Sequence, residues 1–406
     1  MALTKVVVIN DASMAFGGAT GLALLSVRQL RARGIAVTYV CGDRGENPEL
    51  AELGVTVVAA GSAGLLKRGF ADALTRGIYN SATRAMLARQ IAEHDDPGTV
   101  YHVHGWAQIL SPSIFAALAP VAARCFIHAH DMFLACPNGV YMDYPHHQVC
   151  ARRPLSASCV LRNCDKRSYL HKGWRMMRQV SLLRTLDLRH PWAGILAIHP
   201  EMVPRLARAG YPETLFRVLR NPVTPFSATR IPAEDNHDLV YVGRLEEDKG
   251  VRHLAEAAGR CGVGLTCIGE GSLRPELEAR FPDIAITGWQ SREAIAPLLT
   301  RARALVMPSL HPEPFALVLP EALESGLPVA VVKTALLAAE IESAGVGVTF
   351  DVFDPASIDA ALRRLRDAAP EKIRHMSVAG HSRTPRLATT VQEWTDALMM
   401  QYQSVI

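Results

Sequence analysis

The sequence lacks any apolar run of about 18 residues, the length that a helix needs to cross a bilayer. It has only 8 cysteines in 406 residues, far fewer than a secreted, disulfide-stapled scaffold uses. Hydrophobic residues make up 49% and charged residues 20%, which excludes disordered, collagen-like and coiled-coil chains. The first residues, MALTKVVVIND, pass from one lysine into a β-branched run, so we expect a first strand there rather than a signal peptide. These features predict a globular cytoplasmic protein.

The chain as a whole has little excess charge, with a formal net charge of +4. Residues 151–190 are the exception, because ten Lys and Arg stand there against two Asp, a sum of +8. This segment carries no known nucleic-acid-binding motif, so we expect no nucleic-acid partner. It indicates either an anionic partner, such as a phosphate-bearing substrate or an anionic lipid surface, or a solvated helical face.

The length favours two domains, and the hydrophobic pattern has two parts. Short β-branched runs alternate with amphipathic stretches, which is typical of parallel sheets covered by helices. The expected strands are 5–9, 36–40, 55–58, 100–103 and 125–129 in the first set, and 239–242, 265–268, 284–286, 304–307 and 329–332 in the second. Helices are expected at 79–93 and 108–118. The sequence therefore predicts an α/β fold with two doubly wound, Rossmann-like domains.

A polar, proline-containing stretch without apolar periodicity separates the two sets. We predict an N-terminal domain of residues 1–220, a linker of 221–236 and a second domain of 237–384. Residues 385–406 are helical by their spacing and could pack on either domain.

Two glutamates stand eight positions apart in the segment PSLHPEPFALVLPEAL, which directly follows an expected strand. Pro320 suits the first turn of a helix and Gly326 suits its C-terminal cap. Glu321 is therefore expected in that turn and Glu313 in the loop before it. A carboxylate can accept hydrogen bonds from two neighbouring hydroxyls, so the pair could bind a sugar or a ribose. The alternative is a helix cap beside an exposed loop charge.

This segment resembles the Glu-x7-Glu motif of the retaining GT-B glycosyltransferases of family 4, which continue with Gly-x-Pro-Val, as residues 326–329 do here. Residues 242–250, VGRLEEDKG, look like the strand-to-helix loop of that family. Residues 268–271 and 287–289 are similar to its next strand ends. The resemblance implies a GT-B fold with two Rossmann-like domains facing a central cleft, the acceptor on the N-terminal domain and the nucleotide sugar on the second.

The resemblance also implies residue roles. Arg244 and Lys249 would bind the diphosphate, Glu313 the donor sugar and Glu321 the ribose. The residues assigned to catalysis are His130, Arg244, Lys249 and Glu313. Those assigned to donor binding are Gly17, Gly18, Arg244, Lys249, Glu313, Phe315, Ala316, Leu317 and Glu321. Ala316 departs from the family, which usually has glycine there, so the backbone at this position is less permissive.

Two expected strands end in histidine pairs. His130 resembles the family histidine that faces the transferred sugar, and His104 could border the acceptor. We expect His102 and His128 to be structural residues that point to the opposite face of the sheet.

The glycines near the first strand allow a second interpretation. Gly17 and Gly18 stand where relatives place a Gly-Gly loop beside the donor phosphate. The compact fingerprint of dinucleotide-binding proteins is missing after the first strand, and Asp43 is the one feature that favours NAD.

Four of the cysteines, Cys136, Cys150, Cys159 and Cys164, fall within 29 residues. Their spacing, Cys-x13-Cys-x8-Cys-x4-Cys, is not that of a standard zinc finger. Three interpretations are open: a structural zinc held by four thiolates, buried reduced thiols, or a disulfide.

The resemblance implies a retaining hexosyltransferase that uses a nucleoside diphosphate sugar and no catalytic metal or cofactor. The acceptor would be a hydroxyl of a glycan or of a polyprenyl-diphosphate-linked glycan. The +8 segment predicts peripheral association with the anionic inner face of the cell membrane. The alternatives are an NAD-dependent oxidoreductase and a non-catalytic protein that binds a membrane surface.

Overall fold

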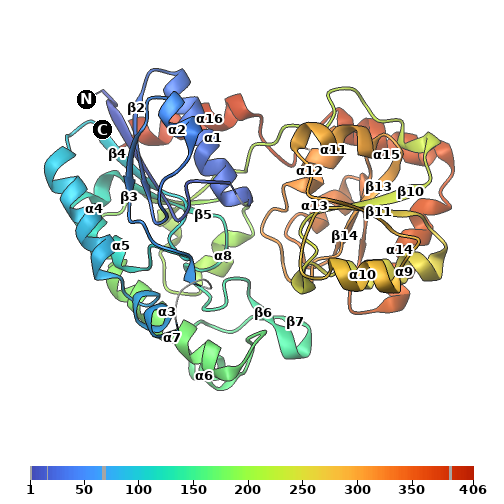
Figure 1. Ribbon diagram of the computed structural model, residues 1–406, viewed down its shortest axis with the longest axis horizontal. Helices are drawn as coiled ribbons and strands as arrows, with labels where there is room; N and C mark the ends of the chain where they lie inside the picture. Colours follow the sequence, from blue (N-terminus) through green and yellow to red (C-terminus); the bar gives the residue numbers. More distant parts are fainter. Residues whose placement is uncertain (1, 16, 66–69, 384–385) are drawn as a thin grey trace. The chain divides into compact units, whose positions relative to one another are not determined.

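The computed structural model describes residues 2–15, 17–65, 70–383 and 386–406, and the chain divides into two compact units (Figure 1). The first unit comprises residues 1–220 together with 392–406, and the second comprises residues 221–391. Among the described residues, no helix is both long and apolar enough to cross a membrane.

The first unit is built on a parallel seven-stranded sheet with the order β3-β2-β1-β4-β5-β8-β9. Its strands are β1 (Lys5–Asn10), β2 (Ala36–Cys41), β3 (Thr56–Ala59), β4 (Thr99–Val103), β5 (Cys125–Ala129), β8 (Gly194–Ala197) and β9 (Phe216–Val218). A separate antiparallel pair consists of β6 (Met142–Asp143) and β7 (Gln148–Val149). The helices are α1 (Gly18–Ala32), α2 (Pro48–Glu52), α3 (Phe70–Arg76), α4 (Ser81–His94), α5 (Ser113–Leu118), α6 (Ala157–Leu161), α7 (Tyr169–Thr185), α8 (Met202–Ala207) and α16 (Val391–Gln403).

The second unit is built on a parallel six-stranded sheet with the order β12-β11-β10-β13-β14-β15. Its strands are β10 (Asp238–Val242), β11 (Leu265–Ile268), β12 (Ala285–Gly288), β13 (Ala302–Met307), β14 (Val329–Val332) and β15 (Gly347–Phe350). Its helices are α9 (Val251–Cys261), α10 (Arg274–Arg280), α11 (Arg292–Leu299), α12 (Val318–Glu324), α13 (Ala338–Ser343), α14 (Pro355–Arg366) and α15 (Pro370–His381). The predicted α/β class with two parallel sheets is confirmed.

The C-terminal helix α16 packs on the core of the first unit. Trp394 and Tyr402 of this helix are 0% exposed and belong to the same buried cluster as Val6 and Val8 of β1. The strands of a parallel sheet are covered on both faces, so an apolar helix face from the far end of the chain can complete one cover.

The expected helix at 108–118 begins later, at Ser113. The buried carboxylate of Asp11 accepts hydrogen bonds of 2.7–2.8 Å from the amides of residues 108–110. These three amides therefore lie in a loop whose hydrogen bonds to Asp11 connect the segment after β4 to the end of β1. The sequence pattern alone does not show this connection.

Candidate active site

The two motif loops of the second unit meet at the carboxyl edge of its sheet. Gly250 ends the loop after β10 with φ +69°, and a Cβ there would lie 1.9 Å from the carbonyl oxygen of Pro308. Only glycine allows this approach. The amide of Leu310 donates to the carbonyl of Asp248 at 3.0 Å, which fixes the loop after β10 against the loop after β13.

This contact pairs two of the predicted site residues. Lys249 Nζ lies 2.5 Å from Glu313 Oε1, and the hydroxyl of Ser309 donates to the same oxygen at 2.8 Å. His311 Nε2 lies 3.4 Å from it. Burial acts to raise the pKa of Glu313, but Lys249 and then His311 outweigh it, so the pKa lies below its usual range. Glu313 is therefore an ionised acceptor at neutral pH.

The second glutamate has a partner that the sequence did not indicate. Arg292, the first residue of α11, binds Glu321 with an Nη1–Oε1 distance of 2.8 Å. Its guanidinium carbon lies 5.2 Å from the centre of the Phe226 ring. Burial raises the pKa of Glu321, and Arg292 opposes the shift. The available signal was an arginine directly after the loop that follows β12, since α11 starts at the same carboxyl edge of the sheet as α12.

Arg244 lies in the loop after β10 with an exposed side chain that has no ion-pair partner within the described residues. Its carbonyl oxygen accepts a hydrogen bond of 2.7 Å from the hydroxyl of Tyr241. The backbone of this loop is thus fixed while the guanidinium remains available to an anion.

Ala316 has φ +50°, the left-handed region that residues other than glycine seldom adopt. It lies between Phe315, which is buried, and Leu317, the N-cap of α12. The carbonyl oxygen of Ala316 accepts from the amide of Leu319 at 2.9 Å, so the strained residue shapes the start of the helix.

In the first unit, Gly17 and Gly18 open helix α1, which has no side-chain cap at its N-cap residue. Gly17 is extended, and a Cβ there would meet nothing within 4 Å among the described residues. The open backbone amides can approach a ligand. Asp43 accepts from the amide and the hydroxyl of Ser13 at 2.7 and 3.0 Å, so the feature that favoured NAD has a structural role.

The four histidines form one stack, and the expectation that His102 and His128 face away is wrong. Ring centres lie 4.0 Å apart for His102 and His104, and 4.2 Å apart for His128 and His130. Residues two apart in a strand share a face, so all four rings gather on one side. His104 Nδ1 lies 3.1 Å from His130 Nε2, while His102 Nδ1 lies 2.6 Å from the Tyr402 hydroxyl.

Burial keeps this stack neutral. It lowers the pKa of His130 to about 3, and it lowers the pKa values of the other three well below their ordinary value. Nitrogen atoms of His102, His104 and His128 lie within 4.8 Å of one another, a spacing that a metal ion could bridge. Both nitrogens of His102 are already hydrogen-bonded, to Tyr402 and to His128, so these rings are better described as a hydrogen-bonded support for His130.

Two cations of the +8 segment are interior, which corrects the interpretation of this segment as a fully solvated face. Arg178 is 7% exposed and lies 5.2 Å from the centre of the Trp106 ring, and Lys172 is 2% exposed. Asp131 lies near Arg178, and burial raises its pKa to about 6 although Arg178 opposes the shift. The sequence did not single out Arg178 or Asp131 as a charged pair beside His130.

Residues 236–367 match the family model described as glycosyl transferases group 1. Glycogen synthase of Mycobacterium tuberculosis is 32% identical over 261 residues, which are 59% of this chain and 60% of that protein. The match thus spans less than two thirds of the curated relative.

Among solved structures, sucrose-phosphate synthase from Thermosynechococcus elongatus has a TM-score of 0.70 at 16% identity over 99% of both chains. Anabaena HepE in complex with UDP and glucose has a TM-score of 0.67 at 15% identity, over 99% of this chain and 100% of that one. Another structure of HepE holds UDP-glucose. The fold is GT-B, as the resemblance implied.

The strain at Ala316 predicts a stabilising substitution. Ala316→Gly should raise the free energy of unfolding of the second unit by about 1 kcal/mol, because glycine adopts positive φ without a Cβ clash. Ala322→Gly, inside α12, is the matched control and should lower it. Chemical denaturation of both variants measures the difference, and two destabilised proteins would show that Ala316 is not strained.

The neutral histidine stack predicts a pH dependence. Because the folded-state pKa values lie below the ordinary value of about 6.5, the unfolded chain binds more protons in acid. The stability of the first unit should be full above about pH 6.5 and should fall as the pH drops towards about 5. The free energy of unfolding, measured by denaturation at each pH, should fall less between about pH 6.5 and about pH 5 in His128→Gln than in the exposed control His94→Gln. Equal slopes would contradict the assignment.

Proposed function

We propose that this chain, which belongs through residues 236–367 to the group 1 glycosyltransferases, transfers a hexose from a nucleoside diphosphate sugar to a hydroxyl with retention of configuration. UDP-glucose is the first donor to test, because HepE, which shares the fold, was solved with it. The proposal rests on one observation above all. Lys249 and Glu313 pair at the carboxyl edge of the second sheet, in the loops where ligands of open α/β sheets bind.

Arg244 and Lys249 would hold the diphosphate. Negative charge grows on this group as the bond to the sugar breaks, and two fixed cations stabilise that charge more in the transition state than in the ground state. The assigned carboxylates have binding roles, so the departing diphosphate itself would take the proton of the acceptor hydroxyl on the face from which it leaves.

Glu313 and Glu321 would bind hydroxyls at opposite ends of the donor. Glu313 is ionised and its side chain is 15% exposed, so it could accept from the sugar while it keeps Lys249. Glu321 would accept from the ribose and exchange part of its contact with Arg292. Trp289 is 76% exposed in the loop after β12 and offers an aromatic face to the base.

His130 would face the transferred sugar as a neutral ring. Its Nδ1 is buried and has no hydrogen-bond partner within the described residues, whereas its Nε2 is bound to His104. An unpaired buried nitrogen is costly unless a ligand satisfies it. A neutral imidazole can bond to a sugar hydroxyl without repelling the positive charge that develops on the sugar ring.

The phosphate role of Arg244 can be tested separately from stability. Arg244→Gln should raise the activation free energy of transfer by about 2–4 kcal/mol, which lowers the rate about 30- to 1000-fold. The free energy of unfolding should change little, since the side chain is exposed. Arg364→Gln, an exposed arginine of α14, is the control and should keep the wild-type rate. Turnover of UDP-glucose and of a panel of other nucleotide sugars measures both. An unchanged rate for Arg244→Gln would remove the assignment.

The two glutamates should separate in binding experiments. Glu321→Gln should weaken the binding of the bare nucleoside diphosphate, because the charge-assisted hydrogen bonds to the ribose are lost. The cost in binding free energy should be roughly 1.5–3 kcal/mol. Glu313→Gln should leave the affinity for the bare nucleotide unchanged and should lower the affinity for the nucleotide sugar. Calorimetric titration of both variants with UDP and UDP-glucose tests this, and equal losses of UDP affinity would show that the roles are assigned incorrectly.

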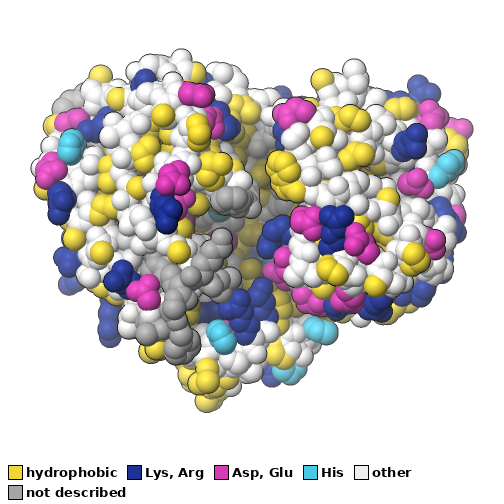
Figure 2. All heavy atoms as spheres, in the orientation of Figure 1, with side chains coloured by type: hydrophobic (Ala, Val, Ile, Leu, Met, Phe, Trp, Pro, Cys, Tyr) yellow, Lys and Arg dark blue, Asp and Glu magenta, His cyan; other side chains and the backbone are white. Residues whose placement is uncertain are grey.

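The acceptor side of the proposal concerns a membrane surface. Leu161 and Leu170 are 79% and 86% exposed, and Met177 is 52% exposed. Figure 2 shows hydrophobic side chains at the tip of the first unit where α6 lies, near Lys, Arg and His side chains. Lys166 and Arg167 are exposed between α6 and α7. Apolar residues beside cations suit an anionic lipid surface, which favours a polyprenyl-diphosphate-linked acceptor.

Vesicle sedimentation tests this part. The protein should bind anionic vesicles at low salt, and binding should fall steeply as the salt concentration rises. Leu170→Asp should weaken binding, whereas Met400→Asp, a 68% exposed residue of α16, should leave it unchanged. Protein that stays in the supernatant with anionic vesicles would remove the membrane claim and leave the sugar transfer in place.

A further inference from the structure

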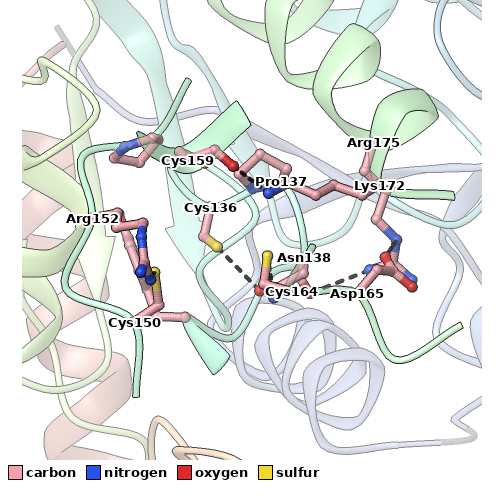
Figure 3. A pocket seen from close by; sticks show the side chains of 12 residues that line it. Cys136, Pro137, Asn138, Cys150, Arg152, Cys159, Cys164, Asp165, Lys172 and Arg175 are labelled. Carbon is pink, nitrogen blue, oxygen red and sulfur yellow. Dashed lines mark hydrogen bonds and ion pairs between the residues drawn. The ribbon is translucent and has the colours of Figure 1, made fainter. Parts of the chain in front are cut away.

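Four cysteines line one small cavity in the first unit (Figure 3). The cavity has a volume of about 20 Å³, which is room for a single water or ion. The cysteines are Cys136, Cys150, Cys159 and Cys164, and all four are free thiols. They come from the turn after β5, the end of β7, helix α6 and the segment before α7. The fold thus brings side chains that are well separated in the chain to the wall of one cavity.

The segment that carries these cysteines has very little core of its own. Besides the cysteines, the buried apolar side chains between residues 136 and 164 are Pro137, Tyr141 and Met142. Its regular structure consists of the two-residue strands β6 and β7, a short 3-10 turn and the five-residue helix α6. A segment this poor in apolar burial needs a staple such as a metal ion to hold one conformation.

The backbone of the segment is strained as well. Tyr141, His147 and Leu155 have φ values of +53°, +52° and +58°, three of the six non-glycine residues with positive φ in the described part of the chain. Such conformations are costly and persist only where the surroundings fix them. Apolar packing contributes little to this, and the constraints come from polar contacts such as the Tyr141 hydroxyl to the carbonyl oxygen of Arg205 and Arg162 to Asp143. A metal ion bound to the four thiols would add to them.

Cations lie where they would balance a thiolate cluster. Arg152 Nη1 lies 3.9 Å from Cys150 Sγ. Lys172 is buried in the cavity wall and donates to the carbonyl oxygens of Cys159 and Arg162. A tetrathiolate with a divalent ion carries a net charge of −2, and two neighbouring cations offset it.

We infer that this cavity is a structural zinc site with Cys136, Cys150, Cys159 and Cys164 as the four ligands. Each thiol would release its proton to water on binding, and the four sulfur atoms would close to about 2.3 Å from the ion. The thiols are now held by weaker bonds that the ion would replace, such as those of Cys136 and Cys164 to the side chain of Asn138, at 3.1 and 3.8 Å.

Zinc binding would require the cysteine sulfurs to move closer together than they lie in this structure. In the described residues, the ligand atoms already within 4.8 Å of one another are those of His102, His104 and His128, so the cysteine sulfurs must approach the ion. Both nitrogens of His102 are already hydrogen-bonded, to Tyr402 and to His128, whereas Cys136 and Cys150 are held by the weaker contacts of their sulfur atoms with the side chains of Asn138 and Arg152. The soft thiolate ligands and the tetrahedral number select zinc.

Metal analysis of the purified full chain tests the site. After dialysis against metal-free buffer, mass spectrometry of the elements should find about one zinc per chain. Cys159→Ser should lower the zinc content by about tenfold or more, because one lost thiolate opens a structural site. Cys261→Ser, a buried cysteine of α9 in the second unit, is the matched control and should keep the zinc.

A second measurement does not depend on the folding of a variant. Exchange of the wild-type protein into Co²⁺ should give the intense visible bands and the thiolate charge-transfer absorbance of a tetrahedral cysteine site, and a chelator should remove them. Zinc-free protein with four alkylatable thiols, or non-reduced protein with these cysteines in disulfides, would overturn the inference. Either result would leave the glycosyltransferase proposal standing, since the donor residues lie in the second unit.

Discussion

The ion pair between Lys249 and Glu313 is the contact on which the candidate site depends. It joins the loops after β10 and β13, two neighbouring strands, and the close approach at Gly250 makes it possible. Loss of either partner would leave a charge in a poorly solvated place, which is costly. The ion pair therefore holds together the cation proposed to bind the diphosphate and the carboxylate proposed to bind the sugar. The proposed donor then enters a site whose charges are already balanced and oriented.

The first unit uses burial rather than ion pairing at its sheet edge. Four stacked histidines would repel one another if protonated, and burial holds their pKa values low enough to keep the rings neutral. Hydrogen bonds between the rings fix which nitrogen each presents. The helix from the C-terminal end of the chain takes part, because Tyr402 of α16 closes the stack. Within the described residues, His104 Nε2, His128 Nε2 and His130 Nδ1 are buried without a hydrogen-bond partner, and His130 Nδ1 is the atom that the proposed mechanism uses.

The fold buries some of the charged residues of the basic segment, residues 151–190, and exposes some of its apolar residues. Lys172 and Arg178 are interior, one beside the thiol cavity and the other among aromatic rings. Leu161 and Leu170 are exposed instead. The usual distribution of charged and apolar residues is thus inverted over a short stretch, which is typical of regions that bind something rather than only fold. The membrane proposal starts from this inversion, whereas the zinc proposal starts from the four thiols of the cavity beside Lys172.

The sequence by itself determined the α/β class and the two parallel sheets, and it carried the motifs of the region that matches the group 1 glycosyltransferase model, because strand periodicity and the Glu-x7-Glu spacing are local patterns. It also placed Glu313 and Lys249 at strand ends, from which a shared sheet edge follows. Tertiary structure alone decided that Arg292 pairs with Glu321 and that Tyr402 bonds to the histidine stack. It also decided that the amides of residues 108–110 bond to Asp11 in a loop instead of forming a helix. Each of these contacts joins residues far apart in the chain, and periodicity carries no information about which distant side chain fills a given place.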